Sequence, residues 1–211
     1  MIGFYNYTVF LTYLGFACGV CGIYFAATAK THAAILALLL AGLCDMFDGK
    51  IAKTKTDRTE QEKKFGIQID SLSDMVCFGI LPPMIAFSAG LHSAPQFAVL
   101  ICFSLAALIR LAYFNVTEEE RQQKTSETRK MYEGLPVTST ALLIPLLFCF
   151  RNDLGAAFPY VATVVYAMIG AAFLIRFRLK KPKLRAMLLF ILVGALELLL
   201  LFIKFRSHQN A

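Results

Sequence analysis

Four aspartates stand in two closely spaced pairs within otherwise apolar stretches of this sequence. Asp45 and Asp48 are three residues apart, and Asp70 and Asp74 are four residues apart. Residues at these separations share one face of a helix, so each pair presents two carboxylates in the same direction. Ionisable side chains are costly in an apolar stretch and mark a functional site by default. The four aspartates are therefore the first candidates for chemistry.

Four carboxylates that meet where the dielectric constant is low repel one another and need cations to remain ionised. A ligand set made only of oxygen atoms suits Mg²⁺ or Mn²⁺, with Ca²⁺ as an alternative, and does not suit zinc. We therefore predict that the four aspartates bind Mg²⁺ or Mn²⁺, and that two such ions clamp a pyrophosphate group. Gly49 and Gly66 flank the aspartates, and a missing side chain there permits a bulky ligand to approach the backbone. The alternative is that both glycines ease helix packing.

The segments that must position these residues are apolar and long enough to cross a membrane. The chain has 211 residues, of which 58% are hydrophobic, and its mean hydropathy is +0.63. A helix needs about 20 mostly apolar residues to cross the hydrocarbon core of a bilayer. We predict one all-α domain over residues 1–211, a polytopic bundle of six to eight spans with a best count of seven. The predicted spans are residues 8–28, 33–53, 66–89, 94–116, 135–150, 156–176 and 186–204.

The distribution of lysine and arginine predicts the orientation of this bundle. The loops 53–65, 117–134 and 176–185 hold 15 of the 21 Lys and Arg residues, whereas the alternate loops hold four. Cytoplasmic loops carry such an excess, so we predict that the N-terminus and the acidic site face the cytoplasm, and we expect the plasma membrane. The same rule accounts for the net charge of +7, and we predict no nucleic-acid partner. We expect the polar residues 117–134 to form a mobile loop.

The run that contains the aspartates resembles the signature of the CDP-alcohol phosphatidyltransferase family. That signature is DxxDGxxAR, followed after a spacer by GxxxDxxxD. This sequence has DMFDGKIAK from Asp45 and GIQIDSLSD from Gly66, so seven of the eight fixed positions match. Lys53 takes the place of the arginine, and it keeps the positive charge without the bidentate guanidinium fork. The usual spacer of eight residues is replaced by the twelve residues 54–65.

Three further segments resemble the phosphatidylserine synthase branch of this family. Residues 65–79, 110–116 and 134–137 have the sequences FGIQIDSLSDMVCFG, RLAYFNV and GLPV. The resemblance implies a CDP-diacylglycerol–serine O-phosphatidyltransferase, which moves a phosphatidyl group from CDP-diacylglycerol to the hydroxyl of L-serine and releases CMP. It also implies a helical homodimer in membrane lipid, with the active site open to the cytoplasmic leaflet.

Carried over position by position, the resemblance implies roles for individual residues. It implies metal binding by Asp45, Asp48, Asp70 and Asp74. It implies that Asp74 also acts as the general base that takes the proton of the acceptor hydroxyl. It implies that the CDP moiety contacts Asp48, Gly49, Ala52, Lys53 and Gly66.

The acceptor has fewer assigned partners. Arg110 lies within a predicted span near its cytoplasmic end, so it is our candidate to bind the serine carboxylate or a lipid phosphate. The alternative for Arg110 is a structural ion pair with one of the aspartates. Asn115 and Ser71 are further candidates near the same site. Glu197 is a lone carboxylate in the last predicted span, and we expect its role to be structural.

Three other functions fit parts of the sequence. An ether-lipid donor, or glycerol 3-phosphate or inositol phosphate as acceptor, would keep the same chemistry. Residues 110–116 and 134–137 favour serine among the acceptors but do not separate the donors. A divalent-cation transporter would also place carboxylates within the membrane, but these four cluster at one end of the spans. A catalytically inactive homologue is the third alternative, and the presence of all four aspartates disfavours it.

Overall fold

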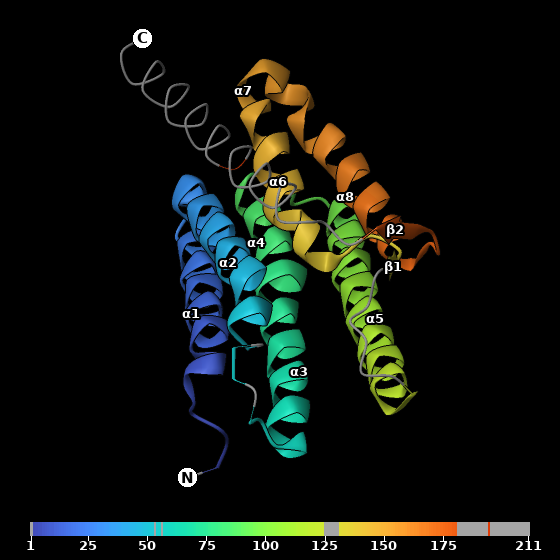
Figure 1. Ribbon diagram of the computed structural model, residues 1–211. Helices are drawn as coiled ribbons and strands as arrows, with labels where there is room; N and C mark the ends of the chain where they lie inside the picture. The colour runs from blue at the N-terminus through green and yellow to red at the C-terminus, as the bar shows by residue number, and fades with distance from the viewer. Residues whose placement is uncertain (1, 53, 56, 125–130, 181–193, 195–211) are drawn as a thin grey trace.

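The structure is a computed structural model that describes residues 2–52, 54–55, 57–124, 131–180 and 194. Within these ranges the chain is helical apart from one short two-stranded ribbon, so the predicted helical class is confirmed (Figure 1). The elements are α1 Tyr7–Ala27, α2 Thr31–Ala52, α3 Glu60–Asp74, the π-helix η1 Met75–Ile80, α4 Leu81–Ser88, α5 Ala94–Lys124, β1 Met131–Glu133, the 3-10 helix η2 Val137–Ser139, α6 Thr140–Cys149, α7 Arg151–Leu154, the 3-10 helix η3 Gly155–Ala157, α8 Phe158–Leu174 and β2 Arg178–Lys180.

Four helical stretches are long and apolar enough to cross a membrane. They are Tyr7–Ala27, Glu60–Ser88, Ala94–Arg121 and Arg151–Leu174, and a shorter apolar helix covers Val137–Cys149. These helices indicate an integral membrane protein. Six of the seven predicted spans coincide with helices. The seventh, residues 186–204, lies with Glu197 outside the described residues, so the count of six to eight spans is not confirmed.

Helix α1 lies along α2 (Figure 1) and also contacts η1 and α4. The face that it turns toward them is a buried stripe of small residues. Gly15, Gly19 and Gly22 lie on this face. A Cβ atom on Gly19 would stand 2.5 Å from Sγ of Cys77, so the two backbones approach more closely than any larger residue permits. Helices in a bilayer gain little from hydrophobic association and rely instead on such close packing of small residues. The glycines therefore bring α1 within reach of the polar groups on its neighbours.

Helices α3 and α4 form one long rod that widens into a π-helix over Met75–Ile80. Two consecutive prolines, Pro82 and Pro83, open α4 and cannot donate hydrogen bonds to the preceding turn. The hydroxyl of Ser104 on α5 donates to the carbonyl of Gly79 at 2.9 Å, which satisfies a backbone acceptor of this turn. Side-chain hydroxyls commonly satisfy such freed carbonyls within membranes. The widened turn begins immediately after Asp74.

Large aromatic side chains join the later helices. The ring of Phe103 on α5 lies 5.2 Å from that of Tyr166 and 5.4 Å from that of Phe173, both on α8. The rings of Phe148 and Phe158 are 5.1 Å apart where α6 turns back toward α8. All five side chains are buried, so this part of the bundle is filled by aromatic rings.

Strands β1 and β2 pair antiparallel beside α5, with Met131 opposite Lys180 and Glu133 opposite Arg178 (Figure 1). The ribbon continues into the next turn, because the amide of Gly134 donates to the carbonyl of Phe177 at 2.6 Å. Gly134 has a φ of +73°, which glycine adopts without strain. The ribbon thus connects two segments that are far apart in the sequence, and the charge pattern predicts the same side of the membrane for both.

The predicted boundary at the end of α5 is wrong. The helix continues past residue 116 to Lys124 and takes in the first part of the segment expected to be a mobile loop. The reason is local: the hydroxyl of Thr117 donates to the preceding carbonyls of Tyr113 and Phe114, and Glu118 forms an ion pair with Arg121 at 2.6 Å. Pairs three residues apart lie on adjacent turns and support a helix that has left the apolar core.

Candidate active site

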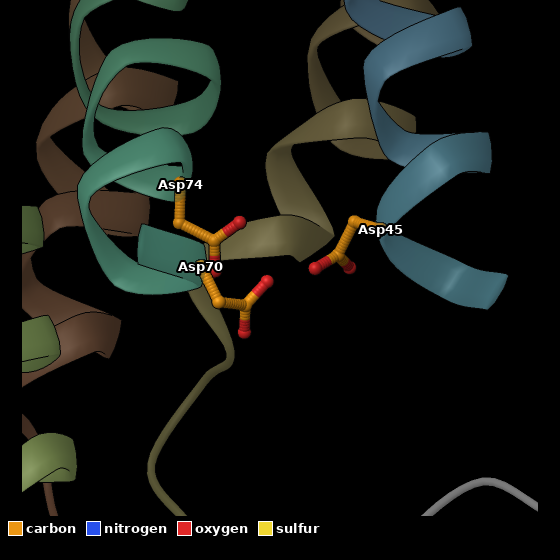
Figure 2. Close-up of side chains that lie close together, drawn as sticks. All are labelled: Asp45, Asp70 and Asp74. Carbon is orange, nitrogen blue, oxygen red and sulfur yellow. The ribbon is translucent and has the colours of Figure 1, made fainter. Parts of the chain in front are cut away.

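Three carboxylates come together where α2 faces α3 (Figure 2). Asp45 projects from α2, and Asp70 and Asp74 project toward it from the last turns of α3. One oxygen of each side chain lies within 4.8 Å of the other two, and all three residues are half-buried. A single ion can therefore contact all three carboxylates. The oxygen-only donor set fits a hard cation such as Mg²⁺ or Mn²⁺.

Asp48 lies beside this group rather than within it. Its side chain is buried, and its Oδ2 accepts a hydrogen bond from the hydroxyl of Thr12 on α1 at 3.2 Å. The two carboxyl groups of Asp48 and Asp70 are close enough to interact. Thr12 was not predicted as a site residue, and only its place on the buried stripe of α1 could have indicated it. The hydrogen bond fixes the carboxylate of Asp48 in the manner of partners that orient metal ligands.

The aspartates line a small pocket between α1, α2 and the α3–η1 rod. The enclosed space is about 10 Å³, which is roughly the size of one water molecule or ion. Its walls are formed by Leu11, Thr12, Gly15, Ala41, Asp45, Asp48, Asp70, Ser73, Asp74, Cys77 and Phe78. A Cβ on Gly49 would meet nothing within 4 Å, so the surface beside the aspartates is open at that residue. The enclosed part suits ions, and a larger ligand fits only against the open side.

The residues expected to contact the CDP moiety surround the end of α2 and the first turns of α3. Ala52 is the last residue of α2, and Gly66 lies on α3. Lys53 is outside the described residues, so its role stays a prediction. The guanidinium group of Arg58 occupies the space next to Gly66, with Nη2 only 2.5 Å from the point where a Cβ would stand. Arg58 was not predicted, because no motif marks it within the long spacer.

The three acceptor candidates have partners that join α3, α5 and the GLPV segment. The hydroxyl of Ser71 donates to Oδ1 of Asn115 at 2.6 Å, and Nδ2 of Asn115 donates to Oε1 of Gln68 at 3.4 Å. Arg110 is buried, and its Nη2 donates to the carbonyl of Gly134 at 3.5 Å. The structure therefore joins Ser71 and Asn115 between α3 and α5, and it places Arg110 against Gly134; none of the three lines the pocket of the aspartates. Their roles toward the acceptor stay predictions.

Glu62 fixes the long spacer to the N-terminal segment. Its Oε1 accepts hydrogen bonds from Nδ2 of Asn6 and Nζ of Lys55, both at 2.8 Å. Its Oε2 accepts from the backbone amide of Thr59 at 2.8 Å, which completes the capping box of α3. The contact with Glu62 raises the pKa of the Lys55 ammonium group. Glu62 thus ties the start of α3 to the spacer and to the segment that precedes α1.

Comparison with known proteins matches the chain to one family over most of its length. Residues 5–175 match the family model described as CDP-alcohol phosphatidyltransferase. The CDP-diacylglycerol–serine O-phosphatidyltransferase of Saccharomyces cerevisiae is 36% identical over 135 residues, which is 62% of this chain and 48% of that protein. The protein of the same name from Bacillus subtilis is 29% identical over 152 residues, which is 71% of this chain and 79% of that protein.

An archaeal relative also matches. The archaetidylserine synthase of Methanothermobacter thermautotrophicus is 31% identical over 159 residues, which is 74% of this chain and 64% of that protein. The matched part of this chain spans about half the length of the yeast relative. The relatives named here share the word serine in their names and differ in the lipid that the names imply.

Proposed function

We propose that this chain, which belongs to the CDP-alcohol phosphatidyltransferase family, transfers a phosphatidyl group from CDP-diacylglycerol to the hydroxyl of L-serine. The products are phosphatidylserine and CMP. The observation that carries the proposal is the meeting of Asp45, Asp70 and Asp74 within 4.8 Å of one another at the family signature. The names of the yeast and Bacillus relatives support serine as the acceptor.

Asp45, Asp70 and Asp74 would hold a divalent ion, and Asp48 would complete the ligand set or a second site beside it. Bound there, Mg²⁺ or Mn²⁺ would neutralise the charge of the pyrophosphate and of the departing CMP. The pocket supports this use because its enclosed space suits an ion and the three clustered side chains offer carboxylate oxygens.

The residues of the chain supply positioning and proton transfer. The serine hydroxyl oxygen forms a bond to the lipid-side phosphorus, the bond from that phosphorus to the oxygen of CMP breaks, and CMP leaves with both electrons. Asp74 accepts the hydroxyl proton, a step that typically contributes about 10²–10⁴-fold to a rate. Gly49 leaves the approach to the aspartates open for the nucleotide. Ser71, Asn115 and Arg110 are proposed to orient the acceptor or a lipid phosphate.

We also propose seven spans, a cytoplasmic N-terminus and active site, a plasma-membrane location and a homodimer. The N-terminus, the start of α3 and the C-terminal end of α5 lie at the same end of the bundle (Figure 1). This end includes much of the excess of lysine and arginine that marks cytoplasmic loops. The arrangement supports a site that draws CDP-diacylglycerol and serine from the cytoplasmic leaflet.

A second candidate keeps the acceptor and changes the donor lipid. The archaetidylserine synthase relative covers a larger share of this chain than the yeast relative does. An ether-lipid CDP donor is therefore a direct alternative to CDP-diacylglycerol.

The test is CMP release by the purified protein in mixed micelles with Mg²⁺ or Mn²⁺. Donors with ester-linked and ether-linked chains are each combined with serine, glycerol 3-phosphate and inositol phosphate. Release that requires serine and stops with EDTA supports the proposal, and the preferred donor decides between the two lipids. Release with another acceptor alone contradicts serine as the substrate. Metal uptake into proteoliposomes without any CMP release would favour the transporter.

A further inference from the structure

Two departures from the family signature meet at one side chain in this structure. Lys53 takes the place of the signature arginine, and the spacer of residues 54–65 is four residues longer than usual. Arg58 lies within that spacer. We propose that Arg58 binds the phosphate groups of the CDP moiety and supplies the guanidinium that the signature position lacks. This inference rests on the proposed function, since it names a binding residue for the same donor.

The contacts of Arg58 place its guanidinium between two fixed positions of the signature. Its Nη1 donates to the carbonyl of Ala52 at 3.4 Å, and its Nη2 donates to the carbonyl of Glu62 at 3.0 Å. Nη2 also stands 2.5 Å from the position of a Cβ on Gly66. Any larger residue at position 66 would displace this group. A side chain from outside the signature therefore occupies the space between Ala52 and Gly66, where the nucleotide is expected.

The guanidinium retains unused hydrogen-bonding capacity. Its Nε is buried and has no hydrogen-bond partner among the residues that the structure describes. In the same part of the chain, no carboxylate forms an ion pair with Arg58. A buried donor without a partner is costly, and the planar guanidinium group of arginine is suited to phosphate oxygens. Phosphate oxygens would accept hydrogen bonds from the guanidinium donors, such as Nε, that have no partner within the described part of the protein.

The spacer is built to hold Arg58 in this position. Glu62 accepts hydrogen bonds from Asn6, Lys55 and Thr59. The hydroxyl groups of Tyr7 and Thr54 form a further hydrogen bond at 3.1 Å between α1 and the spacer. These contacts fix the loop on either side of Arg58 before any ligand binds. A binding group that is already ordered loses less entropy on association.

Lys53 keeps the positive charge of the signature arginine but does not provide its guanidinium group. Arginine presents a planar fork that contacts two phosphate oxygens at once, whereas lysine is a compact point charge. The four additional spacer residues supply the length that lets the chain return from Ala52 and bring Arg58 over Gly66. The substitution at position 53 and the longer spacer are then two parts of one adaptation.

The experiment measures CDP binding to the purified protein in detergent with Mg²⁺, by calorimetry and by the shift in melting temperature. Arg58→Ala is expected to weaken CDP binding by about 10-fold or more, as the loss of a charge-assisted contact does. Arg58→Lys is expected to fall between wild type and Arg58→Ala. The matched control is Lys64→Ala, which removes an exposed cation paired with Glu119 and is expected to bind CDP within about twofold of wild type.

A double variant tests whether an arginine at position 53 can take over the role proposed for Arg58. Adding Lys53→Arg to Arg58→Ala is expected to restore at least part of the lost CDP affinity. In turnover assays, Arg58→Ala is expected to raise the KM for CDP-diacylglycerol and to leave the KM for serine unchanged. A purely structural role would instead lower the melting temperature without ligand and leave CDP affinity intact.

The outcomes separate this inference from the proposed function. If wild-type protein does not bind CDP, both are overturned. If the wild-type protein binds CDP, and both Arg58→Lys and Arg58→Ala bind CDP as tightly as wild type does, only the role of Arg58 is overturned. If Arg58→Ala does not fold, Arg58→Lys alone decides, and an unchanged CDP affinity in that variant overturns the role.

Discussion

The two halves of the bundle are packed by different kinds of side chain. In the acidic half, Tyr7–Ser88, glycines bring α1 close to its neighbours: a Cβ on Gly15 would lie 3.1 Å from Cβ of Cys44, and Gly19 leaves less room still. In the aromatic half, Ala94–Leu174, the rings of Phe103 and Phe173 fill the space between α5 and α8. The three carboxylates that meet lie in the half with the smallest side chains.

The difference follows from what each half must bring together. Carboxylates on separate helices meet only if the backbones approach closely, and small residues allow this in a membrane. The hydrogen bond from Thr12 to Asp48 depends on the same approach of α1. Aromatic side chains keep helices further apart and contribute packing, with few polar groups between them. The aromatic half therefore serves as the support against which the acidic half is held.

The largest expected effect comes from removing the proposed base within the acidic half. Asp74→Asn should lower kcat by about 10³-fold, within the range for loss of a general base, while much of the CDP binding remains. The control is Asp57→Asn, which changes an exposed carboxylate on the spacer. The measurement is CMP release alongside CDP calorimetry. Retained turnover with a loss of CDP binding would contradict the assignment of Asp74 as the base.

The packing contrast itself is tested by one substitution in each half. Gly19→Ala forces a Cβ to within 2.5 Å of the Cys77 sulfur, and such overpacking costs about 1–3 kcal/mol. Gly170→Ala places its Cβ 3.4 Å from Cα of Phe103, which is ordinary contact. We expect Gly19→Ala to lower both the melting temperature and the activity, and Gly170→Ala to change neither appreciably. Equal effects at both positions would show that the halves do not differ in packing.

A smaller effect is expected from the partner of Asp48. Thr12→Val removes the hydrogen bond to that carboxylate and keeps the volume of the side chain similar. Loss of a group that orients a metal ligand commonly weakens metal binding by about 10-fold or more. The measurement is the Mg²⁺ concentration needed for half-maximal activity. Thr163→Val, which removes a hydroxyl contact within α8, should leave that concentration unchanged, and a shift equal to that of Thr12→Val would argue against a local effect.

The smallest effect is expected where the two halves are joined. The buried hydroxyl of Tyr166 on α8 donates to the carbonyl of Pro82 on α4 at 2.7 Å. Tyr166→Phe removes this bond and keeps the ring, so stability should fall by about 0.6 kcal/mol, the usual size for such bonds in membranes. The kcat should stay within twofold of wild type. A large loss of activity would show that the contact between α8 and α4 takes part in the chemistry rather than only in stability.

Hydrophobic length and carboxylate spacing predicted much of this arrangement. Six apolar segments became helices, and Asp45, Asp70 and Asp74 meet as their spacing indicated. The sequence could not predict contacts that depend on tertiary packing: Thr12 is polar and unremarkable until α1 lies against α2. The position of Arg58 over Gly66 depends on how the chain folds back between the end of α2 and the start of α3, and spacing within one helix does not predict that.

The two-stranded ribbon has a consequence for how the protein is made. It joins residues 131–133 to residues 178–180, so it cannot form until α8 has been synthesised. The walls of the acidic pocket all come from residues between Leu11 and Phe78. At about 5–20 residues per second, the ribosome needs roughly 5–20 seconds to add the intervening chain. The pocket can therefore assemble in the membrane while the remainder of the bundle is still being translated, and the ribbon closes the fold as one of its last steps.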